Sequence, residues 1–296
     1  MRWPRSFPML MLLSTVRAGK IFNPSATFSL LDDGLYIQPN ALTNTDLRML
    51  YGVTKDFLMR LKLAVASLNI YDLRAEQEPG GFCWGDVVQR GAGQYELRVH
   101  ELDLRPPDEE PVKVPAILAT LQSRWWPTVV SALGDDAELR SATIVISTNA
   151  SFVTGTPSVS QPWQSAGTLP PEHDNRTYAL VVTIPLQSVV KEGGRVQYLP
   201  RTHSDRSIRV EHDSAEWTPA FLPDVVTPTM EAGTAVTYSY ATQHRGLANR
   251  VPGSFRPVLK LDYFRAGARK RRDSWCEDRG FLLDRQPEAS RLKDEL

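Results

Sequence analysis

The side chains that could carry out chemistry are few in this sequence of 296 residues. Among its five histidines, we consider two as candidate ligands together with a nearby carboxylate, in His173-Asp174 and in His203-Ser204-Asp205. Imidazole and carboxylate groups are common metal ligands in proteins. The sequence has no glycine-rich phosphate loop, no zinc-spaced cluster of cysteines and histidines, and no nucleophile elbow. Metal or ligand binding that involves histidine is therefore the chemistry to consider first.

One segment of the chain has the pattern of a metal-binding motif without its usual ligands. Residues 161–167, QPWQSAG, resemble the Q-x-W-H-x-D-G segment of the phytanoyl-CoA dioxygenase family, non-haem iron oxygenases that consume 2-oxoglutarate. In that family the His and the Asp of this segment bind the iron. Gln164 and Ala166 stand at these two positions here.

The resemblance continues towards the C-terminus. His244, in the segment QHRG, matches the second iron-binding His of the family, and it follows Gln164 by 80 residues, an interval that suits the family. Arg256, 12 residues after His244, matches the arginine whose guanidinium binds the far carboxylate of 2-oxoglutarate. The likeness extends from Asp33 to about Phe264. It implies Fe(II) and 2-oxoglutarate as cofactors and the hydroxylation of a substrate that the sequence does not identify.

The metal ligands are where the sequence departs from the family. Such enzymes hold Fe(II) with two His and one carboxylate, whereas Gln164 is a neutral, weak ligand and Ala166 has no donor atom. One alternative is that His173 and Asp174 reach His244 and replace the missing ligands. The other is a catalytically degenerate binding or regulatory protein that has kept the jelly roll and no longer holds iron.

Three further side chains have two interpretations each. His203 with Asp205 is either a ligand pair or a turn in which the histidine is bonded to neighbouring backbone. Arg256 is either the 2-oxoglutarate ligand or a surface arginine at the start of a strand. Trp163 is either a wall of the pocket or part of the core.

Regular spacing of apolar residues predicts two helices in the first half of the chain. The first covers residues 42–68, with capping residues at 44–46 and a break conceivable at Gly52. The second covers residues 116–133, and Pro127 is expected to kink or divide it.

Strand patterns dominate the rest of the sequence. Strands are expected at 34–38 and 95–99, with loop at 76–93 and an extended connection at 105–115. After Ala142 the expected strands are ATIVIS, SVSQPW, YALVVTIPL, RVQYL, AVTYSYA and VLKLDYF. The strand that begins near Ala235 is expected to end in QHRG, the segment that contains His244. This order predicts a β-rich α+β fold, a double-stranded β-helix or jelly roll with supporting N-terminal helices.

The domain prediction follows from these elements and from a composition that is 42% hydrophobic, enough for a substantial core. We expect one jelly-roll domain over residues 19–268, with helical support in 40–135 and barrel strands in 142–265. A signal peptide over 1–18 and a charged tail over 269–296 flank it.

The two ends of the sequence predict the compartment. Arg2 and Arg5 precede a short apolar run, and the sequence ends in Lys293-Asp294-Glu295-Leu296, the address read by the KDEL receptor. We therefore expect residence in the lumen of the endoplasmic reticulum. The 34 basic and 34 acidic residues balance, which argues against nucleic acid as a partner, and no apolar run approaches the ~20 residues of a membrane span.

An oxidising lumen would permit two modifications. Cys83 and Cys276 are either a disulfide pair or two buried thiols. Asn149 and Asn175 each begin an acceptor sequon for N-glycosylation.

Overall fold

The computed structural model describes most of the expected domain. The described residues are 29–67, 82–84, 87–98, 103–104, 112–113, 118, 121–151, 155–166, 177–204, 225–228, 230–266 and 268. The proposed signal peptide and the charged tail lie outside these ranges.

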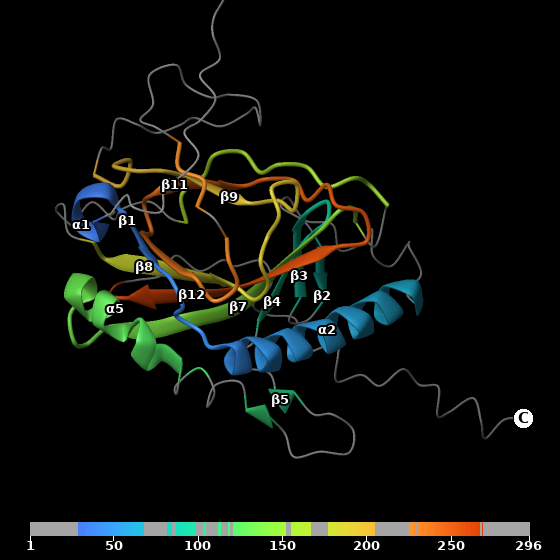
Figure 1. Ribbon diagram of the computed structural model, residues 1–296, viewed down its shortest axis with the longest axis horizontal. Coiled ribbons are helices and arrows are strands. Elements are labelled where there is room, and N and C mark those ends of the chain that lie inside the picture. The colour runs from blue at the N-terminus through green and yellow to red at the C-terminus, as the bar shows by residue number, and fades with distance from the viewer. Residues whose placement is uncertain are drawn as a thin grey trace, which may run out of the picture.

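Two antiparallel sheets make up the centre of the molecule. The larger has eight strands in the order β1-β10-β8-β12-β7-β4-β3-β2, and the smaller pairs β11 with β9. Figure 1 shows the small sheet on one side of β8, β12 and β7, with helices α2 and α5 on the other side. The bounds are β1 Leu35–Gln38, β2 Phe82–Trp84, β3 Val87–Gly91, β4 Gln94–Arg98, β5 Asp103–Leu104, β6 Val112–Lys113, β7 Glu138–Thr148, β8 Ala179–Pro185, β9 Val196–Leu199, β10 Ala235–Ser239, β11 Gln243–Gly246 and β12 Phe255–Phe264.

The helices are α1 (Leu30–Asp33), α2 (Asn44–Ser67), the 3-10 turn η1 (Gln122–Arg124) and α5 (Trp126–Leu133). The long helix expected over 42–68 is confirmed, and it continues through Gly52 without a break. Its cap differs from the expectation. Thr43 lies just before the helix, where its Oγ1 accepts from the Asp46 N–H at 3.3 Å while Asp46 Oδ2 accepts from the Thr43 N–H at 2.8 Å, a reciprocal capping box. The second helix is divided at Trp125, as the proline predicted.

The core lies between the large sheet and the helices. Leu259, Leu261 and Tyr263 of β12 face it, because alternate residues of a strand point to the same side. Trp125 is fully buried there, and its Nε1 donates a 2.8 Å hydrogen bond to Tyr263 Oη. The division of the second helix thus places an indole where its one polar atom has a partner.

Most strand predictions are confirmed, with three corrections. SVSQPW, residues 158–163, forms no strand, and isolated backbone bridges lie just outside it at Pro157 and Gln164. The stretch 76–93 was expected to be loop, but β2 and β3 lie in it and pair with each other. Strand β3 also forms a hairpin with β4, with Gly93 in the turn at φ 70°. The strand before His244 ends at Ser239, and His244 belongs to the next strand, which starts after a turn.

No helix among the described residues is long and apolar enough to cross a membrane.

Candidate functional site

Gln164 and His244 lie directly opposite each other. The Gln164 N–H donates to the His244 carbonyl at 2.9 Å, and the His244 N–H donates to the Gln164 carbonyl at 2.8 Å. His244 also pairs with Tyr198 of β9, and Tyr198 pairs with Val226. Because residues paired in this way show their side chains on the same face, Gln164, His244, Tyr198 and Val226 form a row across the small sheet. The backbone thus brings together two of the positions that the sequence resemblance selected.

The imidazole of His244 lies between aromatic rings. Its centroid is 4.9 Å from that of Tyr238 on β10 and 6.2 Å from that of Tyr198. His244 Nδ1 is 3.0 Å from the Thr242 carbonyl, which can only accept, so Nδ1 carries the proton and Nε2 has the free lone pair. Burial lowers the pKa of His244 to about 4. The imidazole is therefore neutral near pH 7 and presents Nε2 as an acceptor.

The third position of the motif lies in an apolar environment. Ala166 packs against a buried cluster that includes Leu35, Val181 and Tyr238. Within the described ranges, no group of three or more His, Cys, Asp and Glu side chains is placed to hold a metal ion. His244 and the carboxamide of Gln164 are too few and too weak as donors for ferrous iron. The described residues therefore do not fit an iron site.

Arg256 is the second unusual side chain. It is only 6% exposed, and two of its nitrogens, Nε and Nη1, have no hydrogen-bond partner among the described residues. Burial lowers the pKa of Arg256 to about 10, so the guanidinium keeps its charge at neutral pH. The interpretation of Arg256 as a surface residue is wrong. A charged, buried and unpaired guanidinium fits the carboxylate of 2-oxoglutarate or of a similar acid.

Tyr198 lies near both His244 and Arg256. Its ring lies beside His244, its hydroxyl is 3.4 Å from Thr183 Oγ1, and the charge of Arg256 lowers the pKa of Tyr198 by less than burial raises it. Burial raises the pKa of Tyr198 to about 12, so the phenol stays protonated and does not neutralise the guanidinium. Ser147, the partner of Arg256 on β7, has a buried hydroxyl with no partner in the described part of the chain. Tyr198 and Ser147 were not singled out from the sequence.

A chain of three glutamines joins Gln164 to the large sheet. Gln164 Nε2 donates to Gln161 Oε1 at 3.3 Å, and Gln161 Nε2 donates to Gln94 Oε1 at 2.6 Å. Gln94 is on β4, directly opposite Ser147. Gln161 belongs to the segment QPWQSAG, and this was the only indication in the sequence of the hydrogen bonds between the three glutamines.

Trp163 faces away from His244. It is 1% exposed, packs with Leu199, and its ring lies 4.6 Å from the guanidinium carbon of Arg245. Arg245 and His244 are neighbours on β11, so their side chains lie on opposite faces. Trp163 is therefore part of the packing on the far face of the small sheet and not a wall beside His244.

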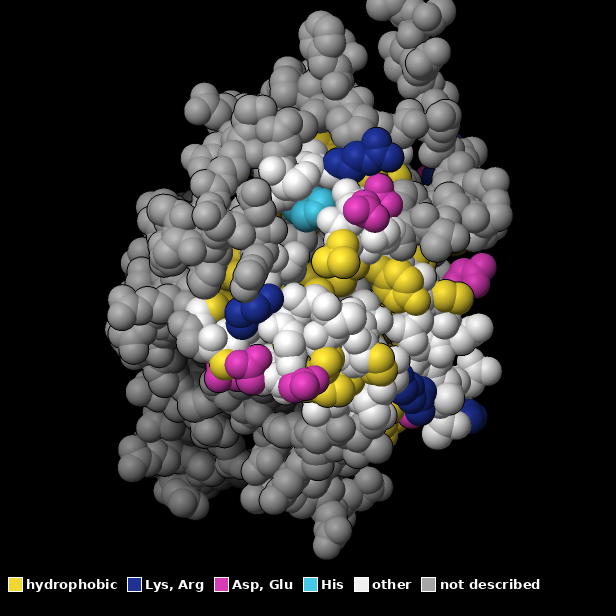
Figure 2. Space-filling view, turned by 90° about the vertical axis from the view of Figure 1, so that its left-hand side faces the viewer, with side chains coloured by type: hydrophobic (Ala, Val, Ile, Leu, Met, Phe, Trp, Pro, Cys, Tyr) yellow, Lys and Arg dark blue, Asp and Glu magenta, His cyan; other side chains and the backbone are white. Residues whose placement is uncertain are grey.

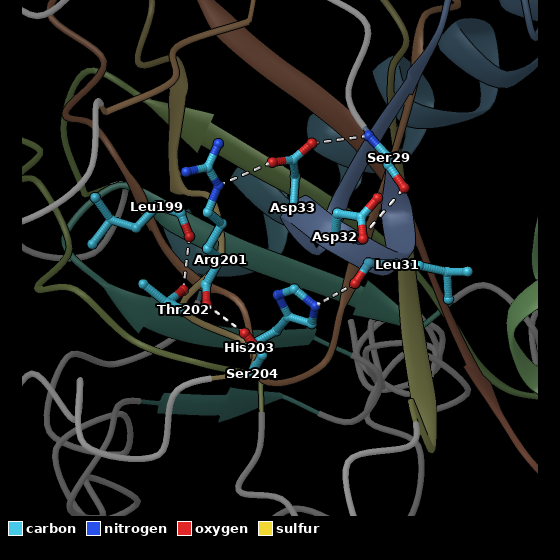
Figure 3. A network of polar contacts seen from close by, with 9 residues as sticks. All are labelled: Ser29, Leu31, Asp32, Asp33, Leu199, Arg201, Thr202, His203 and Ser204. Carbon is cyan, nitrogen blue, oxygen red and sulfur yellow. Dashed lines mark hydrogen bonds and ion pairs between the residues drawn. The ribbon is translucent and has the colours of Figure 1, made fainter.

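His203 holds a turn to helix α1, as Figure 3 shows. Its Nε2 donates to the Leu31 carbonyl at 3.1 Å, and the neighbouring Arg201 pairs with Asp33 at 3.3 Å. A histidine bonded to backbone in a turn is the second of the two interpretations offered for it. Asp205, its proposed co-ligand, lies outside the described residues.

Several other predicted residues cannot be placed. His173, Asp174, Asn175 and Cys276 lie outside the described residues, and the Cys83 side chain is not described. Asn149 is described: it follows β7 and is partly exposed. The rescue ligands and the disulfide therefore stay predictions.

The face that carries α1 shows no large patch of one charge. In Figure 2 acidic, basic and apolar side chains alternate in small groups over its described part. This agrees with the balanced charge of the sequence.

The comparisons with known proteins concern the fold. No protein-family model and no curated protein sequence matches this chain. Among solved structures, the non-haem alpha-ketoglutarate-dependent epimerase SnoN from nogalamycin biosynthesis is 17% identical, with a TM-score of 0.54 over 84% of this chain and 86% of that one. HygX from Streptomyces hygroscopicus, with nickel and 2-oxoglutarate bound, is 13% identical, with a TM-score of 0.51 over 86% and 93%.

A third similar structure is EvdO2 from Micromonospora carbonacea var. aurantiaca complexed with 2-oxoglutarate. It is 15% identical, with a TM-score of 0.50 over 86% of this chain and 95% of that one. This chain thus has a mostly antiparallel, jelly-roll-like fold similar to that of these three structures. At these identities the likeness concerns the fold and not the activity.

The lowered pKa of His244 predicts a pH dependence of stability. Because the folded pKa of about 4 lies below the ordinary 6.5, unfolding takes up a proton between these values, and the contribution of His244 to stability is lost as pH falls from 6.5 towards 4. We expect wild type to lose on the order of 1–2 kcal/mol more than His244→Gln between pH 7 and pH 4.5. Urea unfolding at both pH values measures this. Equal losses in the two proteins would contradict the buried neutral imidazole.

Proposed function

We propose that this protein binds a small carboxylic acid, 2-oxoglutarate or a close analogue, inside its barrel, and that binding does not require iron. The observation that carries the proposal is the Arg256 guanidinium, which is buried and leaves Nε and Nη1 unpaired. We include in the proposal that the two sheets form a double-stranded β-helix. The protein would then be a binding or regulatory module on an oxygenase fold.

The energetic argument concerns the cost of an isolated charge. Moving an ion out of water costs several kcal/mol, and removing one partner of a buried pair leaves this cost uncompensated, typically about 3–5 kcal/mol. A protein that retains such a buried charge does so for a function, such as ligand binding, and not for the stability of its fold. A carboxylate bound in two parallel hydrogen bonds would pair both free nitrogens of Arg256 and offset the cost.

The neighbourhood of Arg256 supports a ligand rather than a missing internal partner. Ser147 adds a buried hydroxyl without a partner, and the Tyr198 phenol lies on the side towards His244. No salt bridge of Arg256 occurs among the residues that the structure covers. These groups are all donors that a carboxylate can accept from.

Replacement of Arg256 should separate binding from stability. We expect Arg256→Met to raise the free energy of unfolding of the ligand-free protein, because it removes an uncompensated buried charge. The same change should abolish the gain that saturating 2-oxoglutarate gives wild type, about 2.7 kcal/mol at a hundredfold excess over Kd. Urea unfolding with and without the acid, in buffer with a chelator, measures both.

Arg250→Met is the matched control, because Arg250 is exposed. It should leave both quantities within about 0.5 kcal/mol of wild type. A wild-type protein that gains nothing from any short dicarboxylate, or an Arg256→Met protein that still gains it, would refute the proposal.

The second candidate function is a hydroxylase that uses Fe(II) and 2-oxoglutarate. The favouring observation is again Arg256, which has the place of the co-substrate arginine in a fold whose solved relatives HygX and EvdO2 contain 2-oxoglutarate. Iron would supply the oxidising chemistry. His244 would have to be joined by His173 and Asp174, because the described residues do not complete a ligand set.

Metal titration separates the two functions. We expect no binding of Fe(II) or Mn(II) by calorimetry, under anaerobic conditions for iron, and no consumption of 2-oxoglutarate. Metal binding that is lost in both His244→Ala and His173→Ala, together with consumption of 2-oxoglutarate, would favour the hydroxylase instead. Gln164→Ala is the comparison, since loss in that variant alone would show the carboxamide to be the ligand.

We also propose that the protein resides in the lumen of the endoplasmic reticulum, with the KDEL receptor as a partner. The basic and apolar residues at 2–13 and the sequence Lys293-Asp294-Glu295-Leu296 support this. We expect glycosidase treatment to increase the gel mobility of the cellular protein, and Asn149→Gln to reduce that shift. Deletion of 293–296 should send the protein to the medium. A cytosolic, unglycosylated protein would contradict the proposal.

A further inference from the structure

The groups opposite Arg256 carry an inference about which acid the site selects. It rests on the proposed function, because it assumes that a carboxylate is bound by Arg256. It concerns the other end of the ligand, where the family fold would place a metal and where this chain has Gln164 and His244 instead.

The orientation of the Gln164 carboxamide is determined by backbone groups at both ends of the glutamine chain. The Gly246 N–H donates to Gln161 at 2.9 Å, so the receiving atom is Gln161 Oε1. The Val159 carbonyl accepts at 3.1 Å from Gln94, so that atom is Gln94 Nε2. Oxygen and nitrogen must then alternate along the chain. The atom that Gln164 directs to Gln161 Oε1 is therefore Nε2, and its Oε1 is left as an acceptor.

His244 contributes a second acceptor on the same face. The Thr242 carbonyl requires the proton on Nδ1, which leaves the Nε2 lone pair. Gln164 and His244 are directly paired, so both acceptors belong to one row of side chains. Among the residues that the structure describes, neither Gln164 Oε1 nor His244 Nε2 receives a hydrogen bond.

Two neutral acceptors select a hydrogen-bond donor. A 2-oxo group has lone pairs only, so it meets these acceptors without a hydrogen bond unless a metal lies between them. A hydroxyl or an ammonium group supplies the missing proton. Ala166 packs into the apolar cluster and has no polar side-chain atom, so it offers no hydrogen-bond donor to a 2-oxo group.

We propose that the site selects a small acid with a hydroxyl or amino group next to one carboxylate, in preference to the corresponding 2-oxo acid. The far carboxylate of this ligand pairs with Arg256. The donor at carbon 2 bonds to Gln164 Oε1 and His244 Nε2. Gln164 and His244 are part-buried, so a ligand held by Arg256 would displace water from their free acceptors. A ligand without a donor leaves both acceptors unpaired, and a site built to bond such a group rejects analogues that lack it.

The test is calorimetry on the full protein in chelator with one carbon skeleton. The probes are glutarate, 2-oxoglutarate, both enantiomers of 2-hydroxyglutarate, and L-glutamate. We expect one hydroxy or amino acid to bind about 10- to 100-fold more tightly than 2-oxoglutarate, the range for a buried partner left unmade. Comparison of 2-hydroxyglutarate with L-glutamate shows whether the site prefers a hydroxyl or an ammonium group.

The variant Gln164→Met has a similar length and no acceptor. It should reduce the preference over 2-oxoglutarate at least fivefold while glutarate binds as in wild type. Lys191→Met, at an exposed position, is the control and should keep the full preference. Thermal unfolding of each variant confirms that it is folded.

The outcomes separate the two proposals. Binding of 2-oxoglutarate as tightly as of every hydroxy or amino acid overturns the selectivity and leaves carboxylate binding intact. A preference that survives in Gln164→Met overturns the role of the glutamine. Absence of binding by all five acids refutes the proposed function, and the selectivity with it.

Discussion

Strand β12 is hydrogen-bonded on both edges, to β7 over its length and to β8 over residues 258–264. A strand held on both sides cannot slip by one residue without turning its whole apolar face to the wrong side. Leu259, Leu261 and Tyr263 must therefore face the helices, and Arg256 must enter the space between the sheets. The burial of this guanidinium follows from the backbone pairing that the core demands. The properties of the site depend on this constraint.

The polar interior is stabilised by connections between the two sheets. The glutamine chain runs from Gln164 beside β11 to Gln94 on β4, and Asn249 Nδ2 donates to the Ser147 carbonyl at 2.9 Å. These bonds satisfy groups that would otherwise be buried without partners. Arg256 and the Ser147 hydroxyl are left out of this network. Arg256 is thus a cation without a salt bridge among the described residues, in an interior whose neighbouring carboxamides are bonded to one another and to the backbone.

Backbone pairing, and not the side chains, places Gln164 and His244 side by side. Gln164 and His244 exchange two backbone hydrogen bonds whatever their side chains are. The side chain at position 164 therefore determines the chemistry of the row and not its geometry. A cation site needs carboxylate or imidazole donors, while a carboxamide oxygen beside a neutral imidazole suits a hydrogen-bond donor. The fold and the activity of such a protein can thus diverge.

The sequence by itself determined the features with a local cause. The spacing of apolar residues gave the helix over 44–67 and most central strands, and the motif pattern selected Gln164, His244 and Arg256. It missed β3, whose pairing with β4 has no strong local signal, and placed a strand over 158–163 where the backbone finds no continuous partner. Tertiary structure alone decided that Arg256 is buried and unpaired and that Gln161 bonds to Gln94, 67 residues away in the chain. Burial and long-range hydrogen bonds depend on how the sheets pack, and local patterns of residues do not predict that packing.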